Sequence, residues 1–143
     1  MAGAEKSIEI NAPIETVYAI ITDYAKYPEF LDDVKAVKVL SQGGGSARIE
    51  QTLALVKEVT MTLKLTEVPN TSVSWVTEGG SRFLKKNDGG WKLEDLGGGR
   101  TRATYGLDVE VGVWVPKKIV DSLTGSTLPK TLEAFKARAE ASS

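Results

Sequence analysis

Apolar and polar side chains alternate with a period of two through the middle of this 143-residue chain, and that pattern constrains its fold most. In KEVTMTLKLTEV, Val59, Met61, Leu63 and Leu65 share one face, and charged or hydroxyl side chains share the other. This alternation is typical of an antiparallel strand with one buried face. The same pattern predicts strands in EKSIEI, in the segment from Val34 to SQGGGS, and in SARIEQTLAL, TSVSWVTE and RTRATYGLDVEV.

Two further short strands are expected in SRFLKK and GWKLEDL. The residues between them, NDGG at 87–90, combine the residue types that favour tight turns. We therefore expect a chain reversal at this point. The other glycine runs, at 43–45, 79–80 and 97–99, are also expected to be hairpin turns.

Helical patterns flank the predicted strands. NAPIETVYAIITDY places Ile14, Val17, Tyr18 and Ile21 on one face, with Asn11 as a candidate cap. In YAKYPEFL, proline restricts the preceding residue, so we expect at most a short helical turn and then a bend. PKKIVDSLTGSTLPKTLEAFKARAE is a long helical pattern, in which a kink or break is expected at the internal proline 129.

Together these elements predict an α+β fold in one domain spanning residues 1–143. Strands that follow each other with hairpin-length turns form an antiparallel sheet, here of about seven strands. Two short helices follow the first strand. The long C-terminal helix is the expected cover for the apolar face of the sheet.

The composition excludes several classes of chemistry. The chain has no cysteine and no histidine, which excludes disulfides, thiol nucleophiles and Ser-His arrangements. A net charge of −1 argues against nucleic-acid binding. The glycine runs lack the spacing of phosphate loops, and the carboxylate pairs lack the spacing of metal loops. We therefore expect no cofactor and no metal. The sequence has no signal-like start and no long apolar run, so a cytoplasmic location is predicted.

Several segments resemble the START-like superfamily, which has the helix-grip fold, and within it the polyketide cyclase/dehydrase and coenzyme Q-binding protein branch. The resemblance covers nearly the whole chain. Its motifs are I-x-I-N-A-P-x-E-x-V-Y at the first strand–helix junction, D-Y-x-x-Y-P-E-F-L at 23–31, G-G-W-K-L-E-D-L-G-G-G-R-T-R-A-T-Y at 89–105, and the terminal T-L-E-A-F-K-A-R-A-E.

The resemblance implies a curved sheet wrapped around the C-terminal helix, with an apolar cavity between them. Members of the family hold lipids, sterols, isoprenoid quinones or polyketides there. Tyr27 and Phe30 would then form a rim at the cavity entrance, although they could instead cap one end of the core. The predicted lining residues, which could equally be plain core packing, are Met61, Trp75, Phe83, Trp91, Tyr105 and Leu123, with Gln51 as an inward polar group.

Three functions remain open from the sequence. The leading hypothesis is a non-enzymatic binder or carrier of a small hydrophobic molecule. The second is a polyketide aromatase/cyclase-dehydrase, but no catalytic residue of those enzymes can be aligned here, so no catalytic residue is assigned. The third is a protein-interaction module without catalysis. Trp114, beside Lys117 and Lys118, is a candidate for transient membrane contact. The sequence predicts no oligomeric state.

Overall fold

The computed structural model describes residues 2–31, 34–54, 58–79, 84–111 and 127–142. The sheet has seven strands, and three helical segments accompany it in the described parts of the chain. The elements are, in chain order, β1 (Ala2–Ile10), α1 (Ile14–Thr22), the 3-10 helix η1 (Tyr24–Glu29), β2 (Val34–Gly43), β3 (Ser46–Ala54), β4 (Glu58–Val68), β5 (Ser72–Gly79), β6 (Leu84–Gly97), β7 (Arg100–Val111) and α3 (Thr127–Ser142).

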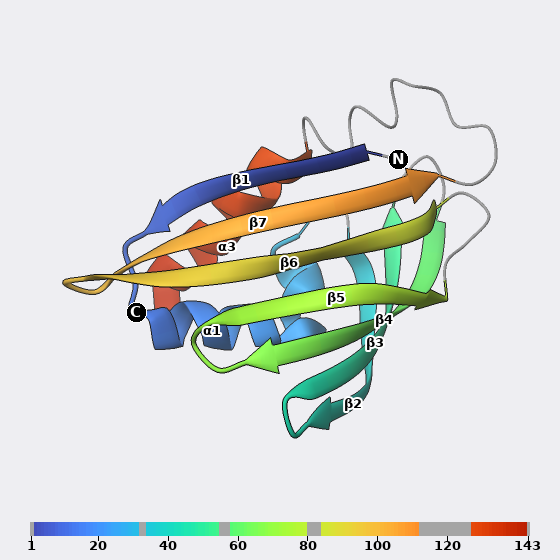
Figure 1. Ribbon diagram of the computed structural model, residues 1–143, viewed down its shortest axis with the longest axis horizontal. Helices are drawn as coiled ribbons and strands as arrows, with labels where there is room; N and C mark the ends of the chain where they lie inside the picture. Colours follow the sequence, from blue (N-terminus) through green and yellow to red (C-terminus); the bar gives the residue numbers. More distant parts are fainter. Residues whose placement is uncertain (1, 32–33, 55–57, 80–83, 112–126, 143) are drawn as a thin grey trace.

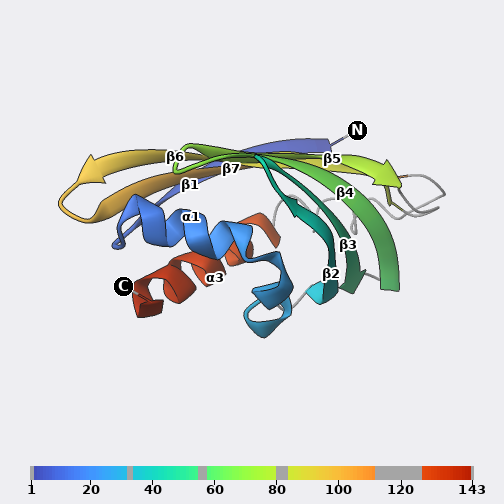
Figure 2. The same cartoon turned by 90° about the horizontal axis from the view of Figure 1, so that it is seen from below.

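The seven strands form one antiparallel sheet in the order β1-β7-β6-β5-β4-β3-β2 (Figure 1). Strands β2 to β7 follow each other as hairpins, and β1 joins at the far edge by pairing Ile8 with Ala103. The sheet is curved, and α1 and α3 lie on its concave side (Figure 2). The predicted α+β fold, with two short helical segments after the first strand and a C-terminal helix, is confirmed.

The hydrophobic core lies between the concave face and the two α-helices. Strand β4 shows the predicted alternation, because its apolar side chains from Val59 to Leu65 are buried and most of the residues between them are exposed. Val17 and Ile21 of α1 and Leu132 of α3 are also buried in this core. The period-two pattern in the sequence therefore identifies the face that the helices cover.

The two predicted short strands around NDGG are in fact one strand, β6, and the predicted turn is wrong. Gly89 pairs with Trp75 of β5, and Gly90 pairs with Ser74. A Cβ atom on Gly89 would lie 2.4 Å from the carbonyl oxygen of Gly106 and 2.8 Å from Cζ2 of Trp75. Glycine is therefore needed here for close packing within a strand rather than for a chain reversal.

The start of the first helix differs in detail from the sequence pattern. Helix α1 begins at Ile14 after Pro13, without a side-chain cap, whereas the backbone N–H of Asn11 donates to Oε2 of Glu140 at 2.9 Å. The described part of α3, Thr127–Ser142, contains Pro129. The expected kink concerns a helix extending before residue 127, and those residues lie outside the described ones.

Candidate functional site

A row of aromatic rings runs along the concave side of the sheet and continues to η1. Trp91 stacks on Tyr105 across β6 and β7, with ring centroids 4.7 Å apart and planes inclined by 22°. Tyr105 also contacts Trp75 at 5.9 Å. On the other side, the edge of Phe135 in α3 meets Trp91 at 4.9 Å. The row therefore joins three strands of the sheet to the C-terminal helix.

Two residues of the YAKYPEFL segment complete this row. Phe135 contacts Phe30 at 5.0 Å and Tyr27 at 5.5 Å, both with perpendicular ring planes. The hydroxyl of Tyr27 donates to the backbone carbonyl of Ile21, which fixes the ring against the end of α1. The guanidinium of Arg138 lies 5.1 Å from the centre of the Phe30 ring. These interactions attach η1 to α3.

A second contact attaches η1 to the sheet. The hydroxyl of Tyr24 donates to Oε2 of Glu67 on β4 at 2.5 Å. The same carboxylate oxygen accepts from Nε2 of Gln42 at 3.1 Å, and Gln42 also donates to the carbonyl of Thr22. The Glu67 carboxylate therefore holds η1 and the end of α1 against β2 and β4.

Burial changes along the concave face. Val73, Trp91 and Ala103 have at most 2% of their surface exposed, because α1 and α3 cover this end of the sheet. Further along the same strands, Trp75 and Leu107 are only half-buried. Burial is therefore complete where the helices cover these strands and only partial further along them.

Polar side chains without protein partners lie on this concave face. Gln51 is 7% exposed and pairs with Met61 across β3 and β4, and its carboxamide makes no hydrogen bond within the described residues. The Tyr105 hydroxyl likewise makes none with the described part of the chain. Burial raises the pKa of Tyr105 well above its ordinary value near 10, so the phenol stays neutral. These groups are free to hydrogen bond to a ligand.

Asn87 on β6 is a third such group, and the sequence analysis missed it. Its Oδ1 is buried and has no hydrogen-bond partner in the described structure, whereas its Nδ2 faces Sδ of Met61 at 3.9 Å. Asn87 was assigned to the turn expected at 87–90. In a continuous strand it lies two and four residues before Gly89 and Trp91, so the period of two would have placed it on their face.

Most of the predicted ligand-binding residues gather on the concave side of the fold. Gln51, Met61, Trp75, Trp91 and Tyr105 come together on the sheet, and Tyr27 and Phe30 face them from η1 and the residue after it. Phe83 and Leu123 lie outside the described residues, as does Trp114, the candidate for membrane contact. Ligand binding by any of these residues remains a prediction.

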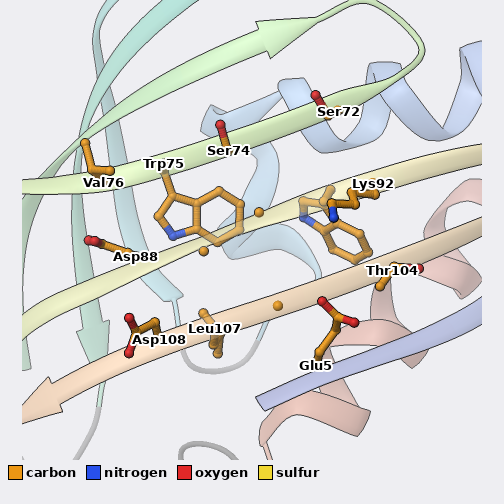
Figure 3. Close-up of a pocket in the computed structure, with 14 residues that line it drawn as sticks. Glu5, Ser72, Ser74, Trp75, Val76, Asp88, Lys92, Thr104, Leu107 and Asp108 are labelled. Carbon is orange, nitrogen blue, oxygen red and sulfur yellow. The ribbon is translucent and has the colours of Figure 1, made fainter. Parts of the chain in front are cut away.

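A hollow of about 960 Å³ lies on the opposite, outer face of the sheet, where the sequence analysis expected nothing (Figure 3). Its floor crosses the glycines of β6 and β7, two of which, Gly90 and Gly106, pair directly. Hydroxyl and charged side chains surround it, and at one end Lys86 forms ion pairs with Asp108 at 2.9 Å and Asp88 at 3.9 Å. The hollow is therefore polar at its rim, in contrast to the aromatic concave face.

The described residues contain no group of three or more carboxylate, histidine or cysteine side chains arranged to hold a metal ion. None of the helices described here is long and apolar enough to cross a membrane.

The sequence and the fold both match known proteins. The family described as "Polyketide cyclase / dehydrase and lipid transport" matches residues 1–140. The structure of the Zhui aromatase/cyclase from Streptomyces sp. R1128 is similar at 15% identity, with a TM-score of 0.87, covering 97% of this chain and 93% of that one. A START superfamily protein from Mycobacterium smegmatis is 23% identical, with a TM-score of 0.86 and 99% of both chains covered.

A protein from Thermus thermophilus is also similar, at 21% identity and a TM-score of 0.84, with 99% of both chains covered. At these identities the similarity establishes the START-like fold and does not transfer a function. No curated protein sequence matches the chain.

Proposed function

The chain belongs to the polyketide cyclase/dehydrase and lipid transport family, and from that premise we propose that it binds a small hydrophobic molecule on the concave face of its sheet. The molecule is of the lipid, isoprenoid quinone or polyketide class, and the protein acts as its binder or carrier. The C-terminal helix forms the other side of the site.

The observation that carries this proposal is the change in burial along the concave face. Val73 and Ala103 are fully buried. Further along the same strands, Trp75, Tyr105 and Leu107 are only half-buried and keep accessible apolar surface. Accessible aromatic surface is unfavourable in water and favourable against an apolar ligand. A filled core would show the same alternation in sequence, but not this remaining exposure.

The first experiment asks what the protein carries. Protein purified from its own host is analysed by native mass spectrometry and by solvent extraction. A bound molecule of apolar character, present in stoichiometric amount and lost on unfolding, is expected. A chain that is empty in native spectra and yields no extractable molecule would argue for the interaction-module hypothesis.

The second experiment tests whether the ligand binds on the concave face. Nile red fluorescence is titrated with the Trp75→Ala and Val76→Ala variants. The two residues are neighbours on β5 with opposite orientations, and Val76 is 52% exposed on the outer face. Trp75→Ala is expected to weaken binding of the dye, and Val76→Ala to leave it unchanged. Equal effects would contradict the assignment of the site.

The aromatase/cyclase alternative is supported by the neutral, unpartnered phenol of Tyr105, which is a suitable donor to an enolate oxygen. It also needs a base, and Glu67, a carboxylate on the helix side of β4, already accepts hydrogen bonds from Tyr24 and Gln42. Turnover of a poly-β-ketone model substrate that is lost in Tyr105→Phe, while binding is retained, would favour catalysis over carriage.

A further inference from the structure

One fully buried side-chain atom in the described structure lacks a hydrogen bond, and it lies beside the proposed site. This atom is Oδ1 of Asn87. A buried acceptor without a donor lowers the stability of a protein, so such atoms are rare and call for a specific explanation.

The position of Asn87 directs this oxygen to the concave side. Asn87 pairs with Val109, which is 4% exposed, and its Nδ2 lies 3.9 Å from the sulfur of Met61. Met61 in turn pairs with Gln51, the other unpartnered carboxamide. The Asn87 carboxamide therefore lies among buried, mostly apolar side chains on the concave side of the sheet, close to the carboxamide of Gln51.

The orientation of the carboxamide follows from its neighbours. A thioether sulfur is a weak acceptor and no donor, so it suits the NH₂ end of the group and not its oxygen. With Nδ2 toward Met61, the Asn87 oxygen is the end that remains for a ligand. It accepts hydrogen bonds, and so the matching ligand group is a donor such as a hydroxyl.

The backbone of Asn87 is held in place by side chains from both β5 and β6. The N–H of Asn87 donates to Oγ1 of Thr77 at 2.8 Å, and this hydroxyl donates to Oδ1 of Asp88 at 3.1 Å. The same Asp88 oxygen accepts from the N–H of Thr77 at 2.8 Å. Ladder pairing between β5 and β6 ends at Trp75 and Gly89, and these three bonds replace it. Such support is typical of a recognition group that must not move.

We infer that Asn87 is a specificity-determining residue, which selects ligands that carry a hydroxyl group on an apolar body over hydrocarbons of the same shape. The inference rests on the proposed function and identifies the ligand chemistry of that site. One well-placed hydrogen bond changes affinity by about five- to tenfold.

The test uses three probes of nearly equal size: 1-naphthol, 1-methoxynaphthalene and 1-methylnaphthalene. Binding to the wild type, Asn87→Leu and Ser74→Ala is measured by calorimetry. Ser74 is exposed on the outer face of β5 and serves as the matched control. Leucine has a similar volume to asparagine and removes the acceptor. Unchanged affinity for 1-methylnaphthalene shows that the variant still folds.

In the wild type and in Ser74→Ala, 1-naphthol is expected to bind more tightly than the other two probes, and Asn87→Leu is expected to lose about five- to tenfold of that preference. Selectivity that is unchanged in Asn87→Leu would overturn the inference while leaving the proposed function intact. If 1-methoxynaphthalene depends on Asn87 as strongly as 1-naphthol does, the carboxamide donates, which overturns the hydroxyl assignment. If none of the probes binds the wild type, the proposed function itself fails.

Discussion

Replacement of Gly89 by alanine is expected to destabilise the protein strongly, because the new methyl group has no space. Its Cβ would lie 2.4 Å from the carbonyl oxygen of Gly106 and 2.8 Å from Cζ2 of Trp75. The first of these atoms belongs to the backbone of the adjacent strand and cannot rotate away. Either β6 and β7 separate, or the Trp75 ring leaves its place beside Tyr105.

The magnitude follows from two opposing effects. Overpacking of this kind costs about 1–3 kcal/mol, and a backbone contact puts this site near the upper end. Alanine also restricts the unfolded chain, which returns about 0.4–1 kcal/mol. We therefore expect Gly89→Ala to lower the free energy of unfolding by about 2 kcal/mol, or about 6 °C in Tm for a chain of this size.

Gly90 provides the matched control, since it is adjacent in β6 and faces the other side of the sheet. A Cβ there would lie 3.2 Å from the carbonyl oxygen of Val73 and 3.3 Å from Cβ of Ser74. Shifts of a few tenths of an ångström relieve such contacts, so Gly90→Ala is expected to stay within about 1 kcal/mol of the wild type.

Urea denaturation followed by tryptophan fluorescence measures both variants, and near-UV circular dichroism reports the packing of the indole rings. The reasoning is refuted if Gly89→Ala is as stable as Gly90→Ala and has an unchanged near-UV spectrum. That result would mean that the glycine is not needed for the position of the Trp75 ring.

Three further outcomes follow from the concave face. Asn87→Leu is expected to raise the free energy of unfolding of the ligand-free protein by about 1–2 kcal/mol, because it removes an unpaired buried acceptor and loses only a weak contact with Met61. If thermal unfolding shows the variant to be less stable than the wild type, the Asn87 oxygen has a hydrogen-bond partner in solution. Thr77→Val removes two hydrogen bonds of the Thr77 hydroxyl, the one it donates to Oδ1 of Asp88 and the one it accepts from the N–H of Asn87. The variant is expected to lose about 2 kcal/mol of stability and to show faster hydrogen exchange at Asn87, and unchanged exchange would contradict this role. The pKa of Tyr105 is raised in the folded protein, so as the pH rises the unfolded chain loses the phenol proton before the folded chain does. The free energy of unfolding is therefore unaffected below pH 10 and decreases as the pH rises above it. Urea titrations of Tyr105→Phe should show a decrease that is smaller by about 1.4 kcal/mol per pH unit, and an identical slope in the variant and the wild type would count against burial of the phenol.

Much of the fold was predictable because burial leaves a periodic record in sequence. Strand β4 shows alternation that the structure reproduces, and the apolar stripe from Ile14 to Ile21 forms the covered face of α1. One local signal was misleading, because asparagine, aspartate and two glycines favour a turn, whereas here Gly89 lies in a strand and makes room for the Trp75 ring. Only the partner strand distinguishes these cases, and it is 14 residues away, at Trp75 opposite Gly89.

The same ambiguity hid part of the candidate site. A residue in a turn cannot be assigned to one face of the sheet. Because 87–90 was interpreted as a turn, the Asn87 carboxamide was not predicted as a candidate ligand group alongside Gln51 and Tyr105. The aromatic members were predictable because ring side chains at inward positions need no partner to be identified. Burial of the Asn87 oxygen without a donor depends on atoms from three strands, which no single stretch of sequence records.

The position of β1 has a consequence for how the protein folds during its synthesis. Its ladder partner is β7, so Ile8 meets Ala103 and Glu9 meets Arg102 across more than ninety intervening residues. Strands β2 to β5 can form hairpins as they leave the ribosome, but their apolar face has no α3 to cover it until residues 127–142 have been synthesised. Folding dominated by such distant pairing takes roughly milliseconds to seconds. During that interval the nascent sheet keeps its apolar face exposed, and slower elongation before residue 100 would prolong its exposure to aggregation.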